Sequence, residues 1–82
     1  MVKTKKQQQA DKQRKIGEAE RERFRLRLIE LRGERSQLEI GKLAGLHQSS
    51  YNEIERGRVD VSLSSIARIA VALGVPIGKL FE

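Results

Sequence analysis

Apolar residues near the middle of the chain recur at helical spacing. Phe24, Leu28 and Leu31 fall at i, i+4 and i+7, which is the repeat of a helix that buries one face. Charged residues occupy most of the positions between them. The pattern predicts a helix over residues 17–32 that ends at Gly33. No proline precedes this segment, so the helix is free to begin earlier.

Two short helices are expected next, joined by a glycine turn. Ser36 and Glu39 match a capping box, which predicts a helix from this point to about Leu43. Gly45 suits the positive φ of a sharp turn after that helix. A third helix is expected over residues 48–55.

The last part of the chain predicts two further helices. Ser62 is placed to cap a helix over residues 63–73, and Pro76 suits the first turn of a short helix that runs through Phe81. The positions that these helices offer to a core are Leu38, Ile40, Leu43, Tyr51, Ile54, Leu63, Ile66, Ala67, Ile69, Ala70 and Leu73. Neither a strand pattern nor an internal repeat is present. We therefore expect an all-α fold of five helices.

The order of short helix, glycine turn and short helix is typical of a helix-turn-helix, whose second helix can enter a DNA major groove. Gly41 and Gly45 allow the two helices to approach closely. The second helix exposes short polar side chains that could reach base edges, namely Gln48, Ser49, Ser50, Asn52 and Glu53. Gln and Asn can pair with adenine, and Glu can accept a hydrogen bond from cytosine.

The positive charge is concentrated at the N-terminus. The chain has a formal charge of +6, and residues 1–15 hold six basic residues and one acidic residue, so they account for +5 of it. We therefore divide the chain into a basic arm, residues 1–17, and a DNA-binding domain, residues 18–82. The arm is either disordered or helical. It is either a solvated tail or a segment that neutralises phosphates.

Composition excludes several classes of protein. The 82 residues include no Cys and one His, so a disulfide framework, a zinc site and a His-dependent catalytic triad are not expected. No apolar run is long enough to span a membrane. We expect no catalysis, no cofactor, no metal and no membrane partner.

The sequence of residues 24–82 closely resembles that of the Cro/repressor-type helix-turn-helix family, the lambda-repressor-like DNA-binding domains. The matching segments are Ser36-Gln37, Ile40-Gly41, Ala44-Gly45-Leu46, Ile54-Glu55-Arg56-Gly57, Ser62-Leu63, Ala72-Leu73-Gly74-Val75 and Leu80-Phe81. The resemblance implies a five-helix bundle that binds operator DNA, usually as a dimer, and regulates transcription. The resemblance fits both a phage repressor and the controller protein of a restriction–modification system. It therefore leaves open whether the protein represses or activates transcription. We expect a cytoplasmic protein that is bound to DNA.

The resemblance also implies roles for individual residues. The expected base contacts are Gln48, Ser49, Asn52 and Glu53. The expected contacts to the DNA backbone are Gln37, Ser50, Tyr51 and Arg58 in the domain, with Lys3, Lys5 and Lys6 in the arm. The tyrosine ring is expected to be mostly buried, with its hydroxyl reaching a phosphate. The exposed apolar residues of the last helices are the expected homodimer interface, namely Val75, Ile77, Leu80 and Phe81.

One charge pair departs from the family pattern. The family often pairs an arginine of the first helix with the glutamate found here as Glu55, but a gapless match places Glu30 opposite it. Either Arg27 or Arg32 substitutes, or the first helix is shifted in register.

Two other classes of function are compatible with the sequence. An antitoxin-type module would hold a partner protein, and residues 1–23 are the candidate segment for it. A non-specific nucleic-acid binder would depend on the arm instead of on the helix over residues 48–55.

Overall fold

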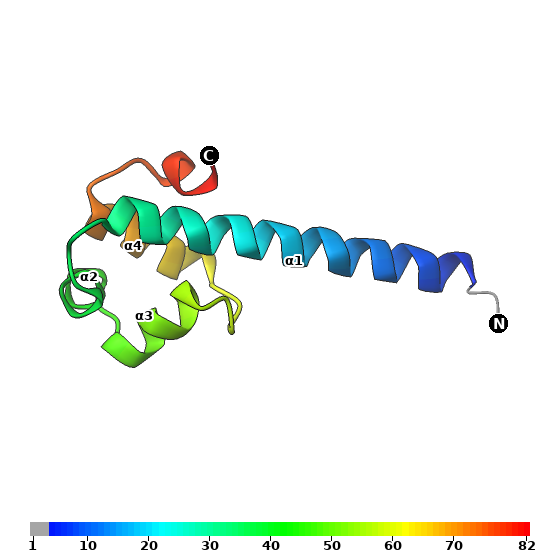
Figure 1. Cartoon of the computed structure of the whole chain (residues 1–82), viewed down its shortest axis with the longest axis horizontal. Coiled ribbons are helices and arrows are strands. Elements are labelled where there is room, and N and C mark those ends of the chain that lie inside the picture. The colour runs from blue at the N-terminus through cyan, green and yellow to red at the C-terminus, as the bar shows by residue number, and fades with distance from the viewer. Residues whose placement is uncertain (1–3) are drawn as a thin grey trace.

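The computed structural model describes residues 4–82 and builds them from helices. Four α-helices are present, namely α1 (Lys5–Arg32), α2 (Gln37–Ala44), α3 (Gln48–Glu55) and α4 (Leu63–Leu73), followed by a 3₁₀ helix, η1 (Ile77–Phe81) (Figure 1). Within the described residues there is no strand, so the all-α prediction is confirmed. The fifth expected helix is a 3₁₀ segment of five residues, a form that proteins use in short pieces.

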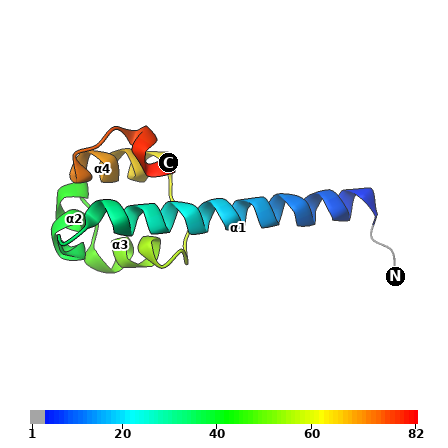
Figure 2. The same ribbon diagram turned by 45° about the horizontal axis from the view of Figure 1, so that its top comes forward.

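The first helix is much longer than expected and dominates the shape of the molecule. Its C-terminal half packs against the other elements, while its N-terminal half extends away from them (Figures 1 and 2). Thr4 caps the helix by accepting a hydrogen bond from the Gln7 amide, and the Gln7 side chain accepts one from the Thr4 amide. This capping box explains why α1 begins at Lys5, and no proline interrupts the helix before residue 17. Most of the basic arm is therefore helical.

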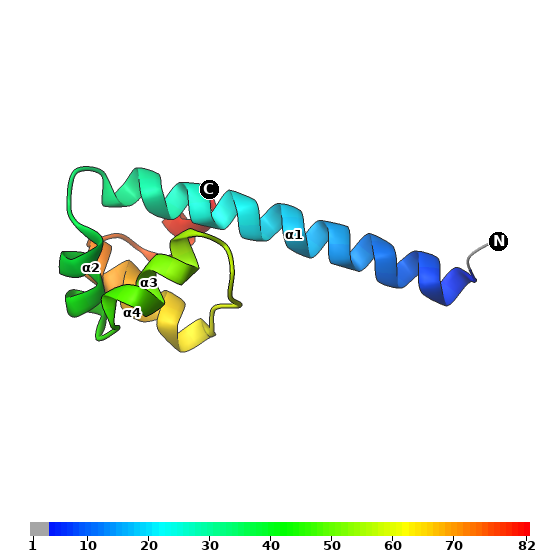
Figure 3. The same cartoon turned by 60° about the horizontal axis from the view of Figure 1, so that its bottom comes forward.

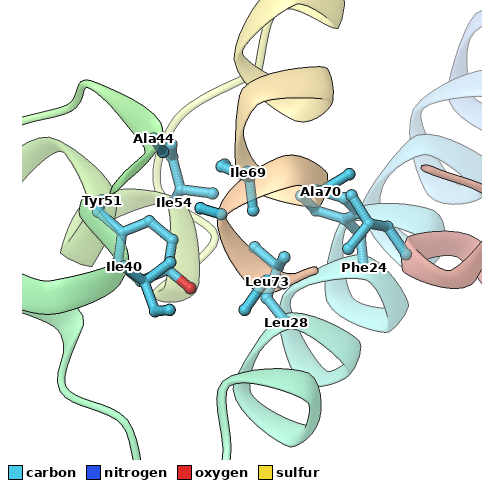
Figure 4. Close-up of a cluster of buried hydrophobic side chains, with 11 residues drawn as sticks. Phe24, Leu28, Ile40, Ala44, Tyr51, Ile54, Ile69, Ala70 and Leu73 are labelled. Carbon is cyan, nitrogen blue, oxygen red and sulfur yellow. The ribbon is translucent and has the colours of Figure 1, made fainter. Parts of the chain in front are cut away.

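All five elements contribute side chains to one core. Phe24 and Leu28 of α1 are buried against residues of α2, α3, α4 and η1 (Figure 4). The other members of the core are Ile40, Ala44, Tyr51, Ile54, Ile69, Ala70, Ala72, Leu73 and Leu80. Leu38, Leu43, Leu63 and Ala67 were expected in the core but are exposed. The buried face of α2 is narrow, because Ile40, Gly41 and Ala44 already fill it.

The expected dimer patch needs one correction. Leu80 is fully buried in the core of its own chain, so it is not part of an exposed patch. Val75 is half-buried, and Ile77 and Phe81 are exposed. The Phe81 ring stacks on Phe24 with a centroid distance of 5.4 Å, and this contact attaches η1 to α1.

Gly17 lies inside α1 without a steric reason for being glycine. A Cβ placed there meets no atom within 4 Å, and glycine in a helix costs about 0.5–1 kcal/mol relative to alanine. We expect Gly17→Ala to slow amide hydrogen exchange of residues 5–16 by up to about fivefold. The reverse change at an exposed position of the same segment, Ala10→Gly, should accelerate it. Equal exchange in both variants would show that these residues do not form a continuous helix in solution.

Candidate nucleic-acid interface

Two glycines set the geometry between α2 and α3. Gly45 adopts a left-handed conformation with φ of 71°, and the Leu46 amide donates a 2.7 Å hydrogen bond to the Gly41 carbonyl. A Cβ at Gly41 would lie 3.1 Å from the Leu46 carbonyl oxygen and 3.7 Å from the Tyr51 Cβ. A side chain at this position would therefore push the two helices apart. The result is a short, tight turn between α2 and α3 (Figure 3).

The helix after this turn presents a polar face to solvent. Tyr51, Ile54 and Glu55 are buried, so α3 is fixed against the core by one side. Gln48 and Ser49 are exposed on the other side, and Asn52 and Glu53 are partly exposed. Viewed down the helix axis, these four residues fall within about half of the circumference, at 3.6 residues per turn. The structure thus places all four expected base-contacting residues on one accessible face.

Arg56 joins this face and was missed by the sequence analysis. It follows α3 in a right-handed helical conformation and is exposed. It lies four positions after Asn52, so both side chains are on the same side of the helix. The signal was available in the sequence as i, i+4 spacing from an expected base contact. Arg56 supplies a cation that can approach a DNA phosphate.

Two of the expected backbone contacts are engaged within the protein. The Arg58 guanidinium lies 3.7 Å from the Glu53 carboxylate, and the Gln37 side-chain amide donates a 3.4 Å hydrogen bond to Glu55. Ser50 is exposed. In the arm, Lys5 and Lys6 are exposed on the first turn of α1, whereas Lys3 lies outside the described residues. Arg58 and Gln37 must exchange these partners for phosphate oxygens if they contact DNA.

An ion pair between half-buried Arg32 and buried Glu55 joins α1 to α3. Arg32 Nε and Nη2 donate to the two carboxylate oxygens of Glu55, at 2.8 and 2.9 Å. These hydrogen bonds raise the pKa of the Arg32 guanidinium against the opposing effect of burial. Arg27 instead donates to the Lys79 carbonyl oxygen and pairs with Glu30. The structure therefore selects Arg32 from the two candidates as the partner of Glu55.

The backbone-contact role expected for Tyr51 is wrong. Its side chain is fully buried, and its hydroxyl is buried without a hydrogen-bond partner, so the hydroxyl does not reach a phosphate. The residue packs beside Ile40 in the core (Figure 4). Burial raises the pKa of the Tyr51 hydroxyl, and the nearby Glu55 carboxylate adds to the rise.

The ionisation of Tyr51 predicts how the fold responds to alkaline pH. Because the folded-state pKa lies above the ordinary value of 10.0, the contribution of Tyr51 to stability is fully present below pH 10 and is lost as the pH rises above it. Tyr51 is the one tyrosine of the chain, so its phenolate absorbance is a specific probe. We expect that absorbance to appear together with loss of the helical circular dichroism. Tyr51→Phe should keep the fold to higher pH, and phenolate formation near pH 10 with intact helices would contradict the burial.

Two kinds of feature were not found within residues 4–82. No group of three or more His, Asp or Glu side chains in this part could hold a metal ion. No helix here is both long and apolar enough to cross a bilayer.

Comparison with known proteins identifies the family. The helix-turn-helix family model of the Cro/C1 type matches residues 27–80, which include α2, α3 and α4. No curated protein and no solved structure matches the chain. Domains of this family bind DNA, regulate transcription and are typically non-enzymatic. The chain belongs to the Cro/C1-type helix-turn-helix family of DNA-binding transcription regulators.

Proposed function

We propose that the protein is a sequence-specific regulator that binds a pseudo-palindromic operator as a homodimer. The observation that carries the proposal is the polar face of α3, where Gln48, Ser49 and Asn52 stand on a helix fixed to the core by its opposite side. A rigid helix with short polar side chains can read base edges in the major groove. Glu53 is proposed as a fourth base contact, and Arg56 and Ser50 as backbone contacts.

The proposed dimer forms through the apolar surface near the C-terminus. Ile77 and Phe81 are 41% and 48% exposed, and Val75 borders them in sequence. A symmetric dimer would place two recognition helices about one helical turn of DNA apart. Sedimentation of the protein alone and with operator DNA tests this part, since a monomer in both samples would contradict it.

Selection of bound duplexes from a random pool tests sequence specificity. At about physiological salt, non-specific binding is weak, so enriched sequences report base recognition. The expected result is a two-fold symmetric site with half-sites about 10 base pairs apart. A pool that stays random would overturn specific recognition by the isolated protein.

Lys5 and Lys6 are proposed to contact DNA phosphates from the start of α1. Each phosphate contact contributes about 0.9 to the slope of log affinity against log salt. We expect the double variant Lys5→Gln/Lys6→Gln to reduce that slope by about 1.8. Its affinity for operator DNA and its affinity for non-operator DNA should fall to a similar degree. Lys79→Gln removes a charge from η1 and serves as the control. An unchanged slope in the double variant would remove these lysines from the interface.

A further inference from the structure

The most exposed large apolar side chains of the described residues gather on α4 and α2. Val71 and Leu63 on α4 are 79% and 74% exposed, and Leu43 on α2 is 62% exposed. Leu63, Ala67 and Val71 follow one another at i, i+4 and i+8, so they form one stripe along α4. Such a patch on a small domain usually marks an interaction surface.

This stripe borders a groove between the two helices. Leu43 from α2 and Ala67 and Val71 from α4 line it, and its charged lining residues are Lys42 and Arg68. No acidic residue occurs in α4, and Glu39, the one carboxylate of α2, does not line the groove. The groove therefore combines apolar lining side chains with two cations and no carboxylate.

The groove is separate from the surface proposed to read DNA. None of its lining residues belongs to α3. α2 lies at the end of the molecule opposite to the start of α1 (Figure 1). A partner in the groove would thus leave the exposed face of α3 and the basic start of α1 free.

We propose that this groove docks an amphipathic α-helix of a partner protein whose apolar face is flanked by acidic residues. A groove between two helices with apolar side chains at helical spacing is the surface that receives such a helix. Carboxylates beside the apolar face of the partner would lie near Lys42 and Arg68, which favours this partner over others. A second copy is disfavoured here, because a symmetric contact would bring like charges together. The basic segment of α1 is excluded as occupant for the same reason.

A pair of peptides with opposite charge tests the proposal. One is a short helical peptide with leucine at every third or fourth position and glutamate beside the leucines, and the other carries lysine in place of glutamate. Titration against the full-length protein, followed by amide chemical shifts, should show the acidic peptide binding with a Kd of about 10–100 μM and shifting residues 42–45 and 67–71. The lysine peptide should not bind.

Charge reversal in the protein gives the sharper result. The double variant Lys42→Glu/Arg68→Glu should bind the acidic peptide with at least tenfold lower affinity. It should also bind the lysine peptide, which the unaltered protein does not. Lys12→Glu/Lys15→Glu makes the same change in net charge on α1 and should leave peptide binding unchanged. Val71→Ser removes an apolar side chain without changing the charge. It should lower the affinity for the acidic peptide about fivefold or more and leave the affinity for operator DNA unchanged.

Three outcomes would overturn the proposal. The first is no saturable binding of the acidic peptide, and the second is equal weakening by the α1 control variant. The third is self-association of the protein that Val71→Ser abolishes, which would assign the groove to a second copy. All three are independent of whether the protein selects an operator.

Discussion

Replacing Arg32 by methionine is expected to lower the free energy of unfolding by about 3–5 kcal/mol. Glu55 is buried, and both of its carboxylate oxygens accept hydrogen bonds from Arg32. Removal of the guanidinium would leave a buried charge with the weaker contact from Gln37, 3.4 Å away. Native proteins have a total stability of about 5–15 kcal/mol, so this loss would be a large fraction of the total. Urea denaturation followed by circular dichroism measures the loss.

Two further variants separate the buried pair from a general effect of removing arginine. Arg23→Met breaks a 3.7 Å pair with Glu20 in which both side chains are more than half exposed, and such pairs contribute about 0–1 kcal/mol. Arg32→Met/Glu55→Met removes both charges and should recover much of the stability lost in the single variant, since no unpaired charge remains. A loss of less than 1 kcal/mol for Arg32→Met would show that the pair is not formed in solution.

This pair is also relevant to DNA binding, because Glu55 links three elements. It accepts hydrogen bonds from Arg32 at the end of α1 and from Gln37 at the start of α2, and it belongs to α3 itself. The angle between α2 and α3 decides whether the exposed face of α3 fits a major groove. We therefore infer that Arg32 supports the proposed recognition surface indirectly, through its hydrogen bonds to Glu55.

The helix boundaries that depend on local chemistry were predictable from sequence. Ser36 and Ser62 accept hydrogen bonds from the Glu39 and Ser65 amides as caps, and Gly45 has the expected positive φ. The start of α1 depends on Thr4 and Gln7, which form a capping box of the same kind as the expected one at Ser36. It was overlooked because no apolar repeat follows it, and a helix without an apolar face gives no periodic signal.

Burial was less predictable, because it depends on which helices meet. Leu43 and Leu63 have the spacing of core residues, but no element covers them, since α2 meets α3 and α4 through Ile40, Gly41 and Ala44. The choice between Arg27 and Arg32 likewise needed the structure. Both are half-buried on α1, and the crossing of α1 with α3 and η1 decides which one meets Glu55.

The candidate site was predictable where it depends on one helix and not where it depends on packing. The exposed face of α3 follows from helical periodicity once Ile54 is placed inside. The burial of the Tyr51 hydroxyl does not follow from periodicity, since the same ring position is compatible with a hydroxyl at the surface. The hydroxyl lies close to Glu55 and Arg32, and that arrangement depends on how α1 packs against α3.

Gln48→Ala and Asn52→Ala are expected to reduce discrimination between operator and unrelated DNA, each by about 1–3 kcal/mol or roughly 5–150-fold. An amide side chain on the exposed face of a recognition helix can make two hydrogen bonds to one base, and alanine makes none. Affinity for unrelated DNA should hardly change, because phosphate contacts supply it. Binding titrations with the selected operator and with a scrambled duplex at the same salt concentration measure both quantities.

The matched control for these variants is Gln13→Ala, which removes the same amide from an exposed position of α1 and should leave discrimination unchanged. The two α3 variants should also differ in which base pairs they tolerate, because their side chains lie one turn apart and reach different positions of a half-site. A repeated selection with each variant should therefore relax one position and keep the others. If both variants lost affinity for operator and scrambled DNA equally, α3 would contact only the DNA backbone. Specificity would then have to come from the shape of the duplex.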